Sequence, residues 1–77
     1  MMKCISFSMT ASRDIIEVKC TLDLKAVSSY RESANPITGE MNCTHVVEFG
    51  GFNYSIKVPY EEFDKAKLTY DFGFKQN

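Results

Sequence analysis

Hydrophobic and polar residues alternate in two stretches near the N-terminus, which is the pattern of half-buried β-strands. The alternation covers residues 3–9 and 15–22, and the small polar residues between them indicate a turn. A hairpin is the simplest connection between two such strands. On the first strand Ile5 and Phe7 are assigned to the core side, so Cys4 is expected to point away from the core. The second strand is expected to bury the face that carries Ile16, Val18, Cys20 and Leu22.

Residues 23–33 allow two interpretations. The segment 24–26 can form one helical turn capped by Asp23. Residues 27–32 can equally form a short third strand. We favour a tight bend followed by that strand. The Asn-Pro pair and the glycine of residues 35–40 then mark a loop.

The strongest local pattern is a second hairpin, formed by residues 41–49 and 52–58 around Gly50-Gly51. A two-residue glycine loop adopts the positive φ angles that tight hairpin turns need, and it fixes the register of the strands. The predicted pairs are Phe49 with Phe52, Val47 with Tyr54, His45 with Ile56, and Cys43 with Val58. The opposite face is expected to be solvated and carries Asn42, Thr44, Glu48, Asn53, Ser55 and Lys57, with Val46 as an exception.

A helix is predicted over residues 60–70. Pro59 ends the preceding strand, and a proline suits the start of a helix because the missing N–H needs no partner there. Phe63, Ala66 and Tyr70 recur at helical spacing and form the expected buried stripe. Gly73 is the expected C-terminal cap.

These elements predict an α+β fold: a small antiparallel sheet of four to five strands, with one C-terminal α-helix packed on one face. We expect a single domain over residues 1–77. Hydrophobic residues make up 44% of the chain and charged residues 25%, which argues against disorder. The core is expected to be thin, because a domain of this size buries only about 60% of the surface that its unfolded chain exposes.

Charge and segment composition narrow the function classes. A formal net charge of −1 argues against the broad basic surface typical of nucleic-acid-binding domains. No apolar run approaches the roughly 20 residues that cross a bilayer, and no secretion signal is visible. We therefore expect a cytoplasmic protein without membrane contact, whose three cysteines remain reduced.

The residues best suited to chemistry are the three cysteines and the single histidine, His45. Three thiolates and one imidazole can bind zinc tetrahedrally, so Cys20, Cys43 and His45 are candidate metal ligands. No Cys-x-x-Cys pair is present, and packing in the core or at a sheet edge is the favoured role of these residues. A Cys43–His45 catalytic pair is disfavoured, because alternate residues of a strand stand about 6.5–7 Å apart. We predict no metal site, no catalytic residue and no cofactor.

Aromatic residues crowd the C-terminal segment, and one helix cannot bury all of them. Some are expected to remain exposed, and exposed aromatic clusters often mark contacts with a partner. The alternative is that Phe72 and Phe74 fold back over the sheet edge and complete the core. The candidate partner-binding residues are Tyr60, Tyr70, Phe72 and Phe74.

The sequence therefore favours a small non-enzymatic protein-interaction module that binds a larger protein. Its size and neutrality are similar to those of small accessory proteins of phages and mobile elements, which inhibit a host or defence protein by binding it. Two alternatives stay open: a small nucleic-acid-binding regulator and a Cys/His metal-binding protein. A thin core and free sheet edges also make a homodimer an option. The nucleic-acid alternative would use basic residues on neighbouring strands, namely Lys3, Lys19, Arg31 and Lys57.

Overall fold

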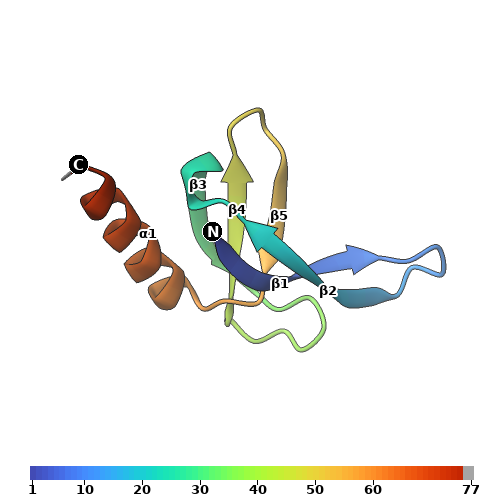
Figure 1. Cartoon of the computed structure of the whole chain (residues 1–77). Helices are drawn as coiled ribbons and strands as arrows, with labels where there is room; N and C mark the ends of the chain where they lie inside the picture. The colour runs from blue at the N-terminus through green and yellow to red at the C-terminus, as the bar shows by residue number, and fades with distance from the viewer. Residues whose placement is uncertain (76–77) are drawn as a thin grey trace.

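The computed structural model describes the backbone of residues 1–75 and the side chains of residues 1–73. It contains an antiparallel five-stranded sheet and one C-terminal helix, which confirms the predicted α+β fold (Figure 1). The elements are β1 (Met2–Met9), β2 (Ile15–Leu22), a 3₁₀ turn η1 (Leu24–Ala26), β3 (Val27–Ser33), β4 (Cys43–Glu48), β5 (Asn53–Ile56) and α1 (Tyr60–Lys75). Strands β4 and β5 are shorter at both ends than the sequence pattern suggests.

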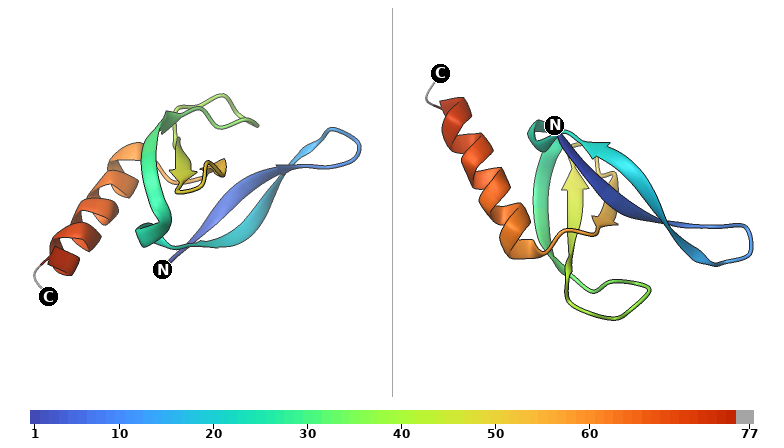
Figure 2. Two further views of the ribbon diagram at one scale, coloured as in Figure 1. Left: turned by 90° about the horizontal axis from the view of Figure 1, so that it is seen from above. Right: turned by 60° about the horizontal axis from the view of Figure 1, so that its bottom comes forward.

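The sheet has the strand order β2-β1-β5-β4-β3. Two parts of it are well paired: the β1–β2 hairpin and the β3–β4–β5 unit. Within the described residues, the join between them has one directly opposed pair, Ser6 with Ile56, next to a 2.7 Å bond from the Lys57 N–H to the Ile5 carbonyl. Beyond this narrow join the β1–β2 hairpin projects away from the other strands (Figures 1 and 2).

The ambiguous segment 23–33 contains both predicted features in succession. The Asp23 carboxylate accepts a hydrogen bond from the Lys25 N–H at 3.0 Å and caps the 3₁₀ turn η1. Strand β3 follows at once and begins with the buried Val27. The favoured reading, a tight bend followed by a strand, therefore matches the structure.

The predicted register of the β4–β5 hairpin is wrong by one residue. The Glu48 N–H donates to the Phe52 carbonyl at 2.8 Å, so the loop has three residues and includes Phe49. Gly50 and Gly51 both adopt positive φ, as expected, at 100° and 90°. The observed pairs are Thr44 with Ile56, His45 with Ser55, Val46 with Tyr54, and Val47 with Asn53.

This shift reverses the predicted faces of β4, because a one-residue slip moves every side chain of one strand to the other side, whereas Tyr54 and Ile56 of β5 lie on the core side as predicted. Val46 joins Ile56 in the core, and Thr44 is fully buried on the face that was expected to be solvated. The Thr44 hydroxyl donates to the Val58 carbonyl at 2.8 Å, so its burial leaves no unpaired donor. The apparent exception in the sequence pattern, Val46, was the residue that marked the buried face.

The predicted faces of β1 are also reversed. Directly opposed residues share a face, and Ser6 lies opposite the buried Ile56. Cys4 and Met2 therefore pack against the core, and Ile5 lies on the other face. On β2 the expected buried face holds only near the end of the strand: Leu22 is buried, whereas Ile16 and Val18 are exposed on the projecting part of the hairpin.

Helix α1 packs on the core face through its first half. Phe63 is fully buried, and its ring meets Tyr30 of β3 edge-on with a centroid distance of 5.0 Å. The Tyr30 hydroxyl donates to the Asp64 carboxylate at 2.7 Å and ties the same two elements. The buried apolar cluster consists of Leu22, Leu24, Val27, Val46, Ile56 and Phe63.

The helix does not end near residue 70, and Gly73 is not its cap. It continues through Gly73 to Lys75, supported by an ion pair of 2.9 Å between Lys67 and Asp71. An interior glycine costs only about 1 kcal/mol relative to alanine, which is too little to stop a helix by itself. The axis of its C-terminal half diverges from the sheet (Figures 1 and 2), and Tyr70 is the residue of that half that packs against the core.

Substituting Phe63 tests how far stability depends on this one side chain. We expect Phe63→Ala to lower the free energy of unfolding by about 3–5 kcal/mol, because a buried ring is lost and a cavity remains. The exposed Phe72 offers a matched control, and Phe72→Ala is expected to change stability by less than about 0.5 kcal/mol. Urea denaturation followed by circular dichroism measures both. Equal losses in the two variants would contradict this account of the core.

Candidate functional site

A groove lies between the two hairpins, at the open end of the core face. We call it the hairpin groove, and it is walled by β1 and β2 on one side and by β4 and β5 on the other. Small polar and apolar groups alternate along it, so it presents no charged cluster of catalytic type. The lining residues are Ser6, Phe7, Ser8, Val18, Cys20, Thr21, Glu48, Phe52 and Tyr54.

One exposed phenylalanine, Phe52, lines this groove, and a second, Phe49, lies across the adjoining turn, where its N–H donates to the Ala26 carbonyl. Phe49 has 72% of its surface exposed and Phe52 has 68%, and both flank the Gly50-Gly51 turn. The Phe52 ring contacts the Tyr54 ring at a centroid distance of 5.5 Å. The rim is therefore aromatic, and the observed register presents these rings to solvent instead of pairing them with each other.

Tyr54 forms the inner end of this aromatic group. It is half-buried and opposes the core residue Val46 across the strands. Burial, together with the Glu48 carboxylate beside its hydroxyl, raises the pKa of Tyr54 well above its ordinary value. The hydroxyl therefore remains protonated at neutral pH and hydrogen-bonded to Glu48.

The predicted partner-binding residues do not form one patch. Tyr60 is half-buried against Tyr30, and Tyr70 packs against the core. Phe72 is 64% exposed, and its exposed neighbour on the helix is Leu68. The side chain of Phe74 lies outside the described residues.

The candidate metal ligands lie on different faces of the sheet. Cys20 is on the core face, whereas Cys43 and His45 lie on the face without the helix. Cys43 is fully buried there, and the His45 Nδ1 lies 3.3 Å from the Ser55 hydroxyl. Among the residues that the structure describes, no group of three or more His, Cys, Asp or Glu side chains is arranged to hold a metal ion.

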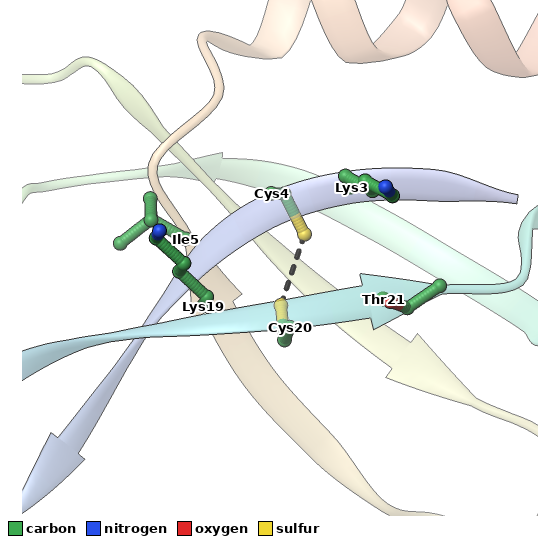
Figure 3. A pocket seen from close by; sticks show the side chains of 6 residues that line it. All are labelled: Lys3, Cys4, Ile5, Lys19, Cys20 and Thr21. Atoms are coloured by element: carbon green, nitrogen blue, oxygen red, sulfur yellow. Dashed lines mark hydrogen bonds between the residues drawn. The ribbon is translucent and has the colours of Figure 1, made fainter.

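The residues that sequence reasoning missed are a pair of thiols. Cys4 lies directly opposite Cys20 in the β1–β2 hairpin, and their sulfur atoms are 3.0 Å apart (Figure 3). Burial, and then the neighbouring Cys20 thiol, raise the pKa of Cys4 to about 12. The predicted turn could have located this pair. A five-residue turn over residues 10–14 pairs residue 9 with residue 15, and the same register then pairs residue 4 with residue 20.

The basic residues considered for nucleic-acid binding do share a surface. Strand register places Lys3, Lys19 and Arg31 on the face of the sheet without the helix. Lys57 lies on the same face, and its ammonium group is paired with the Glu17 carboxylate at 2.6 Å. That hydrogen-bonded pairing raises the pKa of Lys57 and offsets part of the positive charge.

Comparison with known proteins gives no match: no protein-family model, no curated protein and no solved structure is significantly similar to the chain. Within the described part of the chain, no helix has the length and hydrophobicity that a membrane span requires.

Alkaline pH is expected to lower the stability of the fold through two half-buried acidic groups, the Cys4 thiol and the Tyr54 hydroxyl. Cys4 and Tyr54 have folded-state pKa values above their ordinary values of 9.0 and 10.0, so the unfolded chain gives up these protons more readily. Their contribution to stability is complete below those ordinary values and is lost as pH rises toward the folded-state values.

We expect the free energy of unfolding to fall between about pH 9 and about pH 12. Urea denaturation at a series of pH values measures the slope. Tyr54→Phe should flatten it, while costing about 1 kcal/mol at neutral pH for the lost hydrogen bond. A slope that is the same in Tyr54→Phe and the wild-type protein would show that Tyr54 does not titrate in this way.

Proposed function

We propose that this chain is a small non-enzymatic protein-interaction module that binds its partner through the hairpin groove and its aromatic rim. The exposure of Phe49 and Phe52, each by more than two thirds, is the observation that carries the proposal. Neither ring contributes to the buried cluster, so the fold gives no structural reason for two aromatic residues at this turn.

Binding energetics favour this rim over other parts of the surface. Burying a phenylalanine side chain is worth about 1.5–3 kcal/mol, and aromatic anchors beside a groove dominate many interfaces. A partner side chain that enters the groove would meet the side chains of Val18 and Phe52. The site therefore suits an apolar segment.

The free edge of β2 supports the same mode of binding. β2 is the terminal strand of the sheet, spans eight residues and presents Ile16 and Val18 to solvent. A partner in extended conformation can add to such an edge through backbone hydrogen bonds. Its alternate side chains would then lie beside the groove.

The finer parts of the proposal concern cellular role. We propose a cytoplasmic protein that acts as an accessory inhibitor of phage or mobile-element type and occupies the surface of a host or defence protein. The small size of the chain and the exposed aromatic rings support action by occupancy of a partner surface.

Nucleic-acid binding is a second candidate, favoured by the shared face of Lys3, Lys19 and Arg31. If it operates, retention on single- or double-stranded DNA or RNA should weaken steeply as salt rises. Lys19→Glu should weaken it further, whereas Lys65→Glu on the helix should not. Absence of retention at low salt would remove this candidate.

Capture of a protein from the native host tests the main proposal. Immobilised wild-type chain should retain one protein in stoichiometric amount, and mass spectrometry would identify it. We expect Phe52→Ala to weaken the complex at least tenfold, since removal of a central aromatic anchor costs more than about 1.4 kcal/mol. Purified partner and isothermal titration calorimetry provide the measurement.

Phe72→Ala is the matched control, because Phe72 is equally exposed but lies on the helix. It should leave affinity unchanged. If Phe72→Ala abolished binding and Phe52→Ala did not, the helix surface with Leu68 would be the contact instead. If neither variant affected binding, both aromatic surfaces would be excluded as the principal site.

A further inference from the structure

We propose that Cys4 and Cys20 form a reversible cross-strand disulfide by exchange with a small-molecule disulfide, of which glutathione disulfide is an example. The two thiols lie on adjacent strands beside the groove, on a part of the sheet where the strands are regularly paired. Formation of this disulfide does not require the proposed protein partner, although Cys20 also lines the hairpin groove.

The geometry already suits a covalent bond. The two sulfur atoms are 3.0 Å apart, so they need to approach by about 1 Å to reach the usual disulfide length. Directly opposed residues of antiparallel strands have Cα atoms about 4.5–5.5 Å apart, within the range of about 4.4–6.8 Å that disulfides span. Rotation of the two side chains is sufficient, and the backbone register can stay as it is.

Access favours a small-molecule oxidant. Cys4 and Cys20 line a surface pocket of the β1–β2 hairpin (Figure 3). Both cysteines are half-buried, so solvent and small molecules reach them. Cys43 is fully buried on the opposite face of the sheet and does not compete for the same reagent.

The exchange balances in two steps. The Cys20 thiol loses a proton to solvent, and the thiolate attacks one sulfur of glutathione disulfide, which forms a mixed disulfide and expels one glutathione thiolate. Cys4 reacts second, because its sulfur lies 3.0 Å from the Cys20 sulfur. It loses its proton as it attacks the Cys20 sulfur and expels the second glutathione thiolate. The protein loses two protons and two electrons, and the glutathione disulfide takes them up to become two glutathiones.

Incubation of the reduced, folded protein with excess glutathione disulfide tests the proposal. We expect a loss of about 2 Da in the intact mass, with a single pairing of Cys4 and Cys20 in the peptide map. Closing this loop should raise the melting temperature by on the order of 10 °C. Dithiothreitol should reverse both changes. In urea the same treatment should give mixed pairings that include Cys43, because no register then selects the partner.

Single variants separate the two steps. Cys4→Ser should stop at one glutathione adduct on Cys20, whereas Cys43→Ala should close the disulfide as the wild-type chain does. The peptide map of the wild-type protein decides the pairing even if a variant folds poorly. A stable glutathione adduct on the folded wild-type chain, a disulfide involving Cys43, or no reaction at all would each overturn the proposal.

Discussion

The hydrogen bond from the Glu48 N–H to the Phe52 carbonyl sets the register on which the rest of the sheet depends. It closes a three-residue loop in place of a two-residue loop. With that loop, Val46 and Ile56 face the helix, and Ser55 and His45 face away. The alternative register would place His45 opposite Ile56 and remove Val46 from beneath Phe63. One backbone bond therefore selects both the core of the domain and the residues left at its rim.

Much of the architecture was readable from the sequence, because it depends on local signals. Alternation marked the strands, Asp23 marked the bend before β3, and Pro59 preceded the helix. The buried face of each strand was harder to predict, because alternation divides a strand into two sets of residues and does not show which set is buried. Phe49 and Phe52 looked like a core pair because they are large and apolar, yet both are exposed. Thr44 was expected on the solvated face because it is polar, yet it is buried and its hydroxyl donates a hydrogen bond to the Val58 carbonyl.

The candidate site was less predictable for a related reason. A groove between two hairpins depends on how the hairpins are joined, and a single opposed pair of residues, Ser6 with Ile56, carries little signal in the sequence. The C-terminal aromatics drew attention because they are clustered along the chain. In the structure Tyr60 and Tyr70 turn toward the body of the protein, whereas Phe72 points to solvent. Clustering in sequence therefore did not produce clustering in space.

The narrow join between β1 and β5 has a consequence for the width of the groove. In the described part of the sheet, the two walls meet at one opposed residue pair and one adjoining hydrogen bond. Rotation about that line disturbs few hydrogen bonds, and the internal ladder of each hairpin is preserved. The two walls are instead held together by side chains, since Leu22 of β2 belongs to the same buried cluster as Val46 and Ile56. The shape of the groove therefore depends on the packing of the core at its base more than on backbone pairing across it.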